Sequence, residues 1–454
     1  MKKIITLLLF VSMITTILVG CGNKAGTPEG ENPVTSEPTA DTSETTSDEQ
    51  ITLAVTWENL TEDALAAWQK CIIEPFEAEH PDIKIDFQPT PDWQTVIQAQ
   101  LMSGAGPDIF MLEPFDVMTF SQSDLLLKLD KYSEKYGWSD KIFDWALQSC
   151  TIDGSLMAVP HAYETCMFWY NQELLDKYGW KVPETREEFV EVCEEAQKAG
   201  IVPIAYGIMG GESNNMWVIS DYMSSYCGTD TLNKLYAGEL KFTDPEIRKA
   251  FELYYEDYQK GWYSDKKTAS IDYDAMCQLW QSQKALFIPQ GSWYARSILT
   301  GDITFDFGVT EFPSMCDGVS KSQPVGIGAT FAVNANTENA DAAAEFIDFV
   351  YDEQRVATAV SAGLQTLPMN IDTDLYPDGM NEDYIAVQSL MGSVEAEGTV
   401  GYTVWTFCPG NTTICLWENI DKLLMNEITM DEYLEGAQTQ FETDLADGWT
   451  SLND

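Results

Sequence analysis

The sequence predicts an α/β protein built around a parallel sheet. Between Ile51 and Leu112, short apolar stretches with strand-like alternation are separated by stretches whose apolar residues recur at helical spacing. The 454 residues are 44% hydrophobic, which is enough for two domains that each bury a core. A strand, helix, strand succession builds parallel strands joined by right-handed crossovers, with helices on both faces of the sheet.

The first elements follow one another closely along the chain. Apolar residues alternate over 51–57, recur at helical spacing over 65–76 and alternate again over 83–87. A second helix is predicted over 93–102, ending near Gly104, and a short apolar strand over 109–112. Ligands of open α/β sheets bind beyond the carboxyl ends of the strands. This rule points to two segments, Trp57-Glu58-Asn59 and Glu113-Pro114-Phe115.

Further helices and strands are predicted in the rest of the chain. Thr185 and Glu188 form a capping-box pattern at the start of a helix that Gly200 ends. Helical spacing also marks 247–258 and 343–350, and two buried strands are predicted at 308–309 and 331–333. No repeat period of 20–50 residues is visible, so the pattern does not favour a solenoid or propeller.

Composition excludes several classes of function. There are 25 Lys and Arg residues against 73 Asp and Glu, giving a net charge of −48, which repels phosphate backbones and argues against nucleic-acid binding. The chain contains two histidines and no phosphate-binding or dinucleotide fingerprint, so no metal site and no cofactor are expected. Cys71 and Cys193 sit on apolar helix stripes and are expected in the core, while the spacing of Cys408 and Cys415 leaves a disulfide open.

The first fifty residues predict export and a lipid anchor. Lys2 and Lys3 precede an apolar run over 4–19 that is short for a bilayer span, as in a secretory signal peptide. The run ends in Leu18-Val19-Gly20-Cys21, which resembles the lipobox of bacterial lipoproteins. That resemblance implies that 1–21 is a lipoprotein signal, that Cys21 carries the lipid, and that the mature protein is tethered to the outer face of the cell membrane by lipid alone. Residues 22–50 are rich in Thr, Ser, Pro, Gly and acid, which is typical of a disordered linker.

Several segments in order resemble the extracellular solute-binding proteins of ABC importers, in the family 1 branch that includes maltose-binding protein. Together they extend over nearly all of 51–445: Ser103 to Ile109, Gly154 to Pro160, Tyr170 to Leu175, Val182 to Thr185, Gly291-Ser292-Trp293, Phe307 to Pro313, Gly326-Ile327-Gly328 and Ile428 to Glu432. The resemblance implies a two-lobed fold of the type II periplasmic-binding-protein kind, with discontinuous lobes that close on a ligand. It implies a first lobe of 51–162 and 322–371 and a second lobe of 163–321 and 372–454. Hinge segments are expected near Ala162 to Thr165, Gln323 to Gly326 and Asn370 to Asp372.

The resemblance also implies a set of ligand-binding residues. These are acids, amides and aromatics at positions where family members contact a sugar: Glu58, Asn59, Glu113, Phe115, Glu164, Trp217, Trp293 and Trp405. Glu164 matches a ligand-binding Glu and Trp293 matches a Trp stacked on a sugar ring, whereas Phe115 replaces a polar group and argues against maltose itself. Carboxylates and amides pair with sugar hydroxyls, and aromatic rings cover the C–H face of a sugar. Trp57, which completes an apolar alternation, is expected in the core.

Three functions are compatible with these residues. The leading one is a non-enzymatic, monomeric receptor that binds a sugar or oligosaccharide outside the cell and delivers it to the permease of an ABC transporter. A lipid-anchored glycoside hydrolase would also use acids near aromatic residues, with two carboxylates flanking the scissile bond. The same receptor fold would suit a polyamine, through charge pairing and cation–π contacts.

Overall fold

The computed structural model describes residues 50–91, 93–209 and 214–449, which all belong to one compact unit. The expected signal peptide, Cys21 and nearly all of the expected linker lie outside the described residues. No helix among the described residues has both the length and the apolar character needed to cross a bilayer.

The N-terminal elements form as the sequence predicts. Strands β1 (Ile51–Trp57), β2 (Ile83–Pro89) and β3 (Ile109–Leu112) are parallel, with Ile51 opposite Ile83 and Val55 opposite Ile109. Helix α3 (Trp93–Met102) has the predicted bounds. The predicted helix over 65–76 is continuous but irregular: α1 (Glu62–Trp68) passes through a π-helical turn, Gln69–Ile73, into α2 (Glu74–Glu79).

The sheet as a whole is mixed, although its N-terminal strands β1, β2 and β3 are parallel as predicted. Its strand order is β2-β1-β3-β10-β6-β8-β7, and β10 (Gln323–Val333) runs antiparallel to both β3 and β6 (Ala158–Asn171). The reason is topological: β10 enters beside β3 from a segment about two hundred residues later in the chain, and local sequence patterns carry no information on its direction.

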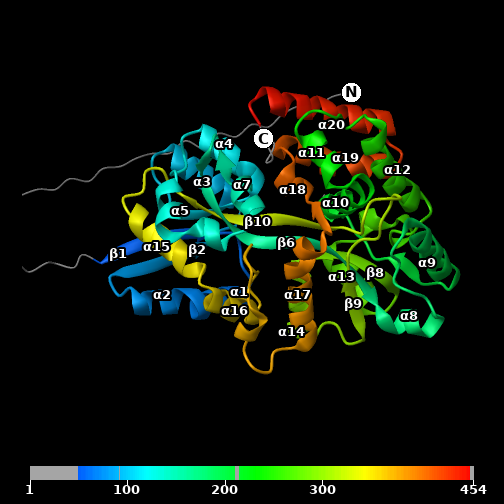
Figure 1. Ribbon diagram of the computed structural model, residues 1–454, viewed down its shortest axis with the longest axis horizontal. Helices are drawn as coiled ribbons and strands as arrows, with labels where there is room; N and C mark the ends of the chain where they lie inside the picture. The colour runs from blue at the N-terminus through cyan, green and yellow to red at the C-terminus, as the bar shows by residue number, and fades with distance from the viewer. Residues whose placement is uncertain (1–49, 92, 210–213, 450–454) are drawn as a thin grey trace, which may run out of the picture. The chain divides into compact units, whose positions relative to one another are not determined.

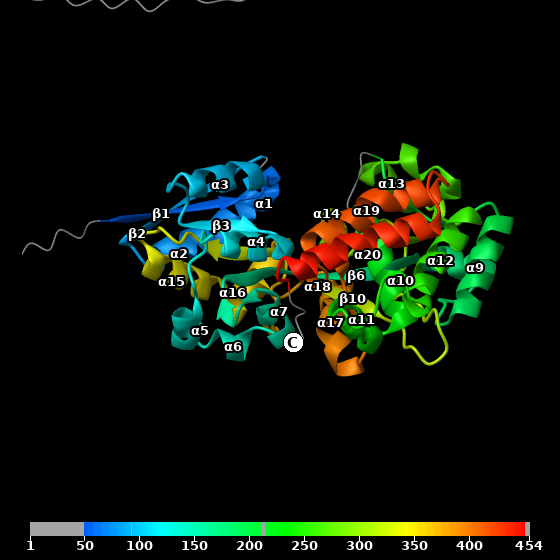
Figure 2. The ribbon, with the colours of Figure 1, turned by 90° about the horizontal axis from the view of Figure 1, so that it is seen from above.

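The long strands β6 and β10 connect two groups of strands, one around β1 and one around β8. The first half of β6 pairs with β10, and its second half pairs with β8 (Ala285–Gly291) and β9 (Phe307–Thr310). The start of β10 pairs with β11 (Val400–Tyr402), and β7 (Val202–Ile204) pairs with β8. In Figure 1, β1 and β2 lie toward one end of these two strands and β8 and β9 toward the other, and Figure 2 gives a second view of this division.

Two of the expected hinge segments lie side by side in these strands. Thr165 is opposite Val325 and Glu164 is opposite Gly326 in the β6–β10 ladder. The pairing is irregular directly after this point, between Ile327 and Ala329, so that Gly328 forms a bulge. The third expected segment, Asn370 to Asp372, lies in the loop before a short 3₁₀ turn, Thr373–Leu375.

Helices cover both groups of strands. The group around β1 carries α4 (Val117–Gln122), α5 (Asp130–Tyr136), α6 (Trp138–Lys141), α7 (Asp144–Ser149), α15 (Ala340–Val350) and α16 (Glu353–Ser361). The group around β8 carries α8 (Gln172–Tyr178), α9 (Arg186–Lys198), α10 (Asn214–Cys227), α11 (Thr229–Tyr236), α12 (Pro245–Gln259), α13 (Tyr273–Gln281), α14 (Arg296–Thr300), α17 (Glu382–Glu397), α18 (Val404–Phe407), α19 (Gly410–Leu424) and α20 (Met430–Ala446). A two-residue hairpin, β4 (Thr151–Ile152) with β5 (Ser155–Leu156), precedes β6.

Local predictions in these regions are mostly confirmed. The Thr185 hydroxyl caps α9 by accepting a hydrogen bond from the Glu188 backbone, and Gly200 follows the helix with a φ of +77°. Trp57, Cys71 and Cys193 are buried in the core. The predicted strand at 331–333 is the buried end of β10, but β9 at 308–309 is only half-buried, because it flanks β6 at the margin of the sheet.

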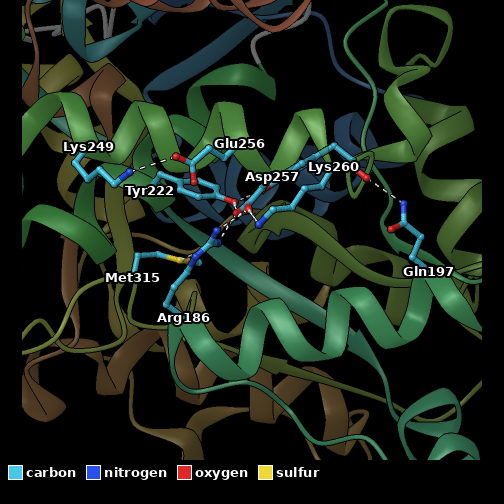
Figure 3. A network of polar contacts seen from close by, with 9 residues as sticks. Arg186, Gln197, Tyr222, Lys249, Glu256, Asp257, Lys260 and Met315 are labelled. Carbon is cyan, nitrogen blue, oxygen red and sulfur yellow. Dashed lines mark hydrogen bonds and ion pairs between the residues drawn. The ribbon is translucent and has the colours of Figure 1, made fainter.

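A buried ion pair ties three helices of the second group together (Figure 3). Arg186, at the start of α9, donates two hydrogen bonds to the carboxylate of Asp257 on α12, one of them Nη2 to Oδ1 at 2.6 Å. The Tyr222 hydroxyl of α10 donates to the same carboxylate at 2.7 Å and accepts from Tyr263 at 3.0 Å. The Asp257 side chain is fully buried. Burial disfavours the guanidinium charge, but the hydrogen bonds that Arg186 donates to Asp257 outweigh this effect and raise the pKa of Arg186.

Candidate ligand-binding cleft

A cleft of about 520 Å³ opens where the two groups of strands meet. It is lined by residues that follow β1 and β3, by residues of α10, α18 and α19, and by Glu164 of β6. The lining includes all but one of the site residues predicted from the sequence: Glu58, Glu113, Phe115, Glu164, Trp217, Trp293 and Trp405. Segments more than three hundred residues apart in the chain therefore converge on one site.

Asn59 is the exception among the predicted residues. It is exposed and does not line the cleft. The chain leaves the sheet at Trp57, the end of β1, and Glu58 is the residue whose side chain reaches the cleft. The adjacent amide was predicted from its place in the sequence, which does not say which of two successive side chains faces the ligand side.

Three carboxyl groups share the cleft, and no Lys or Arg is among the described residues that line it. Burial raises the pKa of Glu164 to about 8, with a further contribution from Glu58, while Gln365 and Trp405 oppose the shift. Burial and the charges of Glu164, Glu58 and Asp116 raise the pKa of Glu113 well above its ordinary value. Burial also raises the pKa of Glu58. The cleft is thus an acidic, partly desolvated environment in which the carboxyls disfavour one another's ionisation.

Glu164 occupies a space that a glycine leaves free. An added Cβ at Gly328 would lie 2.1 Å from Glu164 Cδ, so the carboxyl of Glu164 rests against the backbone of the β10 bulge. Gln365 Nε2 donates a hydrogen bond to Glu164 Oε1 at 3.3 Å. The position of this acid therefore depends on both long strands.

The Trp293 ring is fixed by contacts with neighbouring protein residues. It follows β8, and its Nε1–H donates to Gln290 Oε1 at 3.1 Å; Gln290 in turn donates to the Cys277 thiol at 3.4 Å. The ring lies directly over Gly291, where an added Cβ would be 2.0 Å from it, and its centroid is 4.7 Å from that of Trp217. Trp293 is half-buried, so the protein fixes the ring and leaves part of it free for a ligand.

The remaining aromatic side chains complete the walls. Trp405 of α18 is 4% exposed, and its buried indole N–H lies near the Glu164 carboxyl, whose pKa it lowers. Trp417 of α19, which was not predicted from the sequence, also lines the cleft, and its buried Nε1–H has no hydrogen-bond partner in the structure. Trp417 lies one helical turn after Thr413, another lining residue, so the only pattern in the sequence is the i, i+4 spacing of an ordinary helix face. The unpartnered Trp417 donor at this wall favours a ligand with acceptor oxygens.

No group of three or more His, Cys, Asp or Glu in the described part of the chain is arranged to hold a metal ion. The polar groups that line the cleft are three carboxyls, the Gln365 amide, the Thr413 hydroxyl and indole N–H groups, set among aromatic rings. Such a cavity suits an organic ligand with both hydroxyl groups and an apolar face.

The family model for bacterial extracellular solute-binding proteins matches residues 58–357. The chain belongs to this family. Among the curated relatives of this solute-binding protein, an ABC transporter extracellular-binding protein of Pyrococcus horikoshii is 25% identical over 454 aligned residues, covering 97% of this chain and 98% of that protein. The maltotriose-binding protein of Pyrococcus abyssi is 25% identical over 339 residues, covering 73% of this chain and 69% of that protein.

Solved structures support the same fold for the solute-binding protein. A chitin oligosaccharide binding protein superposes with a TM-score of 0.73 at 19% identity, covering 87% of this chain and 99% of that one. A maltose-bound protein of T. maritima superposes with a TM-score of 0.70 at 18% identity, with 87% and 99% coverage. The predicted type II fold is confirmed.

Replacing Gly328 by Ala tests how the solute-binding protein positions Glu164. The added methyl group would overlap the Glu164 carboxyl and displace it from the cleft. Because its raised pKa keeps Glu164 largely protonated at neutral pH, the lost hydrogen bond is worth about 0.5–1.5 kcal/mol, and ligand affinity should fall by about two- to tenfold. Gly392→Ala on α17 is the matched control, since a Cβ there meets nothing within 4 Å. Titration calorimetry on both variants measures the difference, and equal affinities would show that Glu164 does not need this space.

The raised pKa of Glu164 predicts a specific pH dependence of stability for the ligand-free protein. A carboxyl whose pKa is higher in the folded state stabilises the fold at low pH, and that contribution is lost as the pH rises from about 4.5 to about 8. Glu164→Gln should therefore be more stable than wild type at pH 8, by at least about 1 kcal/mol, and equal to it near pH 4.5. Urea unfolding at both pH values measures this, with the exposed Glu187→Gln as control. A constant difference at both pH values would contradict the assignment.

Proposed function

We propose that this solute-binding protein captures a sugar or oligosaccharide in the cleft and delivers it to the permease of an ABC transporter. The observation that carries the proposal is the convergence of three carboxyl groups and four tryptophans on one cavity of about 520 Å³. Sugar hydroxyls donate to carboxylates and accept from indole N–H groups, and an aromatic ring covers the apolar face of a pyranose. Relatives include a maltotriose-binding protein and, in Streptococcus mutans, a multiple sugar-binding protein.

Closure on the ligand is part of the proposal. The expected lobes, 51–162 with 322–371 and 163–321 with 372–454, would turn about the adjoining segments of β6 and β10 and about residues 370–372. Two contacts join residues of the two expected lobes: Arg296 Nη2 is 3.4 Å from Asp63 Oδ2, and Gln122 Nε2 is 3.4 Å from the Asp447 carbonyl. A ligand that touches both lobes stabilises the closed state by the contacts that exist only there.

A polyamine is the second candidate ligand, and one observation favours it. The cleft holds three carboxyl groups with no basic residue among its described lining residues, so a cation would find both charge partners and aromatic faces. A glycoside hydrolase would need two carboxylates working as an acid and base pair. The relatives with descriptive names are binding proteins, which supports a receptor.

Titration calorimetry separates these functions. The purified protein is titrated with glucose, maltose, cellobiose, xylobiose, the dimer of N-acetylglucosamine, raffinose and spermidine. We expect at least one sugar to bind with micromolar or better affinity and spermidine to give no heat beyond dilution. Binding of spermidine alone would replace the sugar by a polyamine. Release of reducing sugar from any oligosaccharide would make the protein an enzyme and overturn the receptor proposal.

We also propose that Cys21 is lipid-modified and tethers the receptor to the outer face of the cell membrane, because the lipobox and linker pattern precede a domain of an extracellular family. Cys21→Ser should release the protein into the medium or soluble fraction with its thermal stability unchanged. Labelling of cells with a radioactive fatty acid checks this. Equal incorporation into wild type and variant would contradict the anchor.

A further inference from the structure

A second, smaller cavity continues from the cleft past Trp293. It has a volume of about 200 Å³ and shares Glu58, Trp293 and Gln365 with the cleft. We call it the side chamber; its other lining residues include Trp57, Trp68, His161, Arg296, Tyr384 and Gln388. Separate small-molecule sites usually exceed about 300 Å³, so a cavity of this size that shares three side chains with the cleft is an extension of it.

The floor of the side chamber is rigid and aromatic. Trp57 and Trp68 are 2% and 3% exposed, with ring centroids 5.4 Å apart. The His161 ring packs 4.9 Å from Trp57 and 5.4 Å from Trp68. Because these side chains hold one another in the core, the inner end of the chamber is fixed and apolar, with only a small part of each ring exposed.

His161 adds a polar group without charge. It is 7% exposed, its Nδ1 has no hydrogen-bond partner in the structure, and burial lowers its pKa to about 3, so the imidazole is neutral at physiological pH. A neutral imidazole both donates and accepts. It therefore matches a hydroxyl better than it matches an ion.

The side chamber differs from the cleft in its hydrogen-bonding character. Both cavities are lined by Glu58 and Gln365, but Glu113 and Glu164 line only the cleft, whereas the Arg296 guanidinium and the Gln388 amide line only the chamber. Arg296 is paired at 3.4 Å with Asp63, whose side chain is 87% exposed, so its remaining N–H groups are not committed to a buried partner. Within the residues described, Arg296 is the one Lys or Arg lining either cavity.

We propose that the side chamber holds a second sugar ring, so that the receptor selects disaccharides or longer oligosaccharides over monosaccharides. This inference rests on the proposed function. One ring lies in the cleft on the acidic side of Trp293, and the next passes beyond Trp293 to lie over Trp57 and Trp68. His161, Arg296 and Gln388 pair with the hydroxyls of that second ring and thereby determine ligand length.

Matched pairs of sugars test the proposal. The purified protein is titrated with glucose against maltose and cellobiose, with xylose against xylobiose, and with N-acetylglucosamine against its dimer. Wild type should bind the best disaccharide at least about 30-fold more tightly than its own monosaccharide. Arg296→Ala and Gln388→Ala should each weaken that disaccharide by about tenfold or more and change monosaccharide affinity by less than twofold.

Two controls make the test specific to the chamber. Trp217→Ala, at a residue that lines the cleft and not the chamber, should weaken monosaccharide and disaccharide alike. Gln98→Ala, an exposed glutamine of α3, should change neither. Melting temperatures of all variants establish that they are folded. The proposal is overturned if monosaccharide and disaccharide bind equally well, or if the chamber variants weaken both equally or neither. If no sugar binds to wild type, the proposed function itself fails and the chamber proposal fails with it.

Discussion

Trp293→Ala should lower the affinity for the bound sugar by about 30-fold or more. The substitution removes the ring on which the sugar is expected to stack, a contact worth roughly 0.5–1.5 kcal/mol beyond area burial. The apolar area lost, at about 25 cal/mol per Å², brings the expected loss to at least ~2 kcal/mol. Titration calorimetry with the best-binding sugar measures it.

The stability of the ligand-free variant decides whether Trp293 is a binding or a core residue. The ring is half-buried and is supported by Gly291, Gln290 and Trp217, so its loss should destabilise the fold by less than the about 3–5 kcal/mol typical of a buried Trp. Trp138, which is fully buried, is the matched comparison for a structural tryptophan. A large loss of stability with nearly normal sugar affinity would make Trp293 structural, and the binding site would have to be reassigned.

Asp257→Ala should destabilise the fold by about 3–5 kcal/mol, the largest stability effect we expect from a single polar side chain. The change leaves the Arg186 guanidinium half-buried without its carboxylate and takes the acceptor from Tyr222 (Figure 3). Breaking one member of a buried pair costs more than removing both, because the remaining charge is uncompensated. Urea unfolding measures the loss.

The neighbouring Glu256 provides the control. It lies on the same helix and pairs at 3.3 Å with Lys249, but its side chain is 48% exposed, so Glu256→Ala should cost no more than about 1 kcal/mol. The double variant Arg186→Met with Asp257→Leu should recover much of the stability lost in Asp257→Ala. A loss for Asp257→Ala that matches Glu256→Ala would show that burial of this pair does not matter to the fold.

The sequence predicted the individual helices and strands near the N-terminus, but not how strands far apart in the chain pair with one another. Alternation and helical spacing located β1, β2, α3 and β3, because each of these signals is complete within about ten residues. Strand β10 pairs antiparallel with β3, although the two segments are about two hundred residues apart. Nothing in the local sequence of either segment indicates that they pair. The mixed sheet therefore became visible only in three dimensions.

Some residues of the candidate site could be predicted from the sequence and others could not. The strand-end rule located Glu58 and Glu113, and resemblance to the family located Glu164 and Trp293, which all line one cleft. Trp417 was missed because a helical tryptophan has no distinctive pattern. The side chamber was missed for another reason, since it is formed by core residues such as His161 that have no binding pattern of their own.

The role of a glycine in β10 can be seen only from the residues that pack against it. In the sequence, Gly326-Ile327-Gly328 is notable only as an incomplete nucleotide-binding pattern and as one of the family-like segments. In the structure, Gly328 forms the bulge and leaves room for the Glu164 carboxyl, which would collide with any larger residue. A close approach between two strands explains the glycine, and no property of the local sequence predicts it.

A crystal structure with the best-binding sugar tests the central claim most directly. We predict a ring stacked on Trp293, with its hydroxyls within hydrogen-bond distance of Glu164 and of at least one of Glu58 and Glu113. Density for the sugar anywhere other than this cleft, or in the cleft without contact to Trp293 and Glu164, would contradict the account.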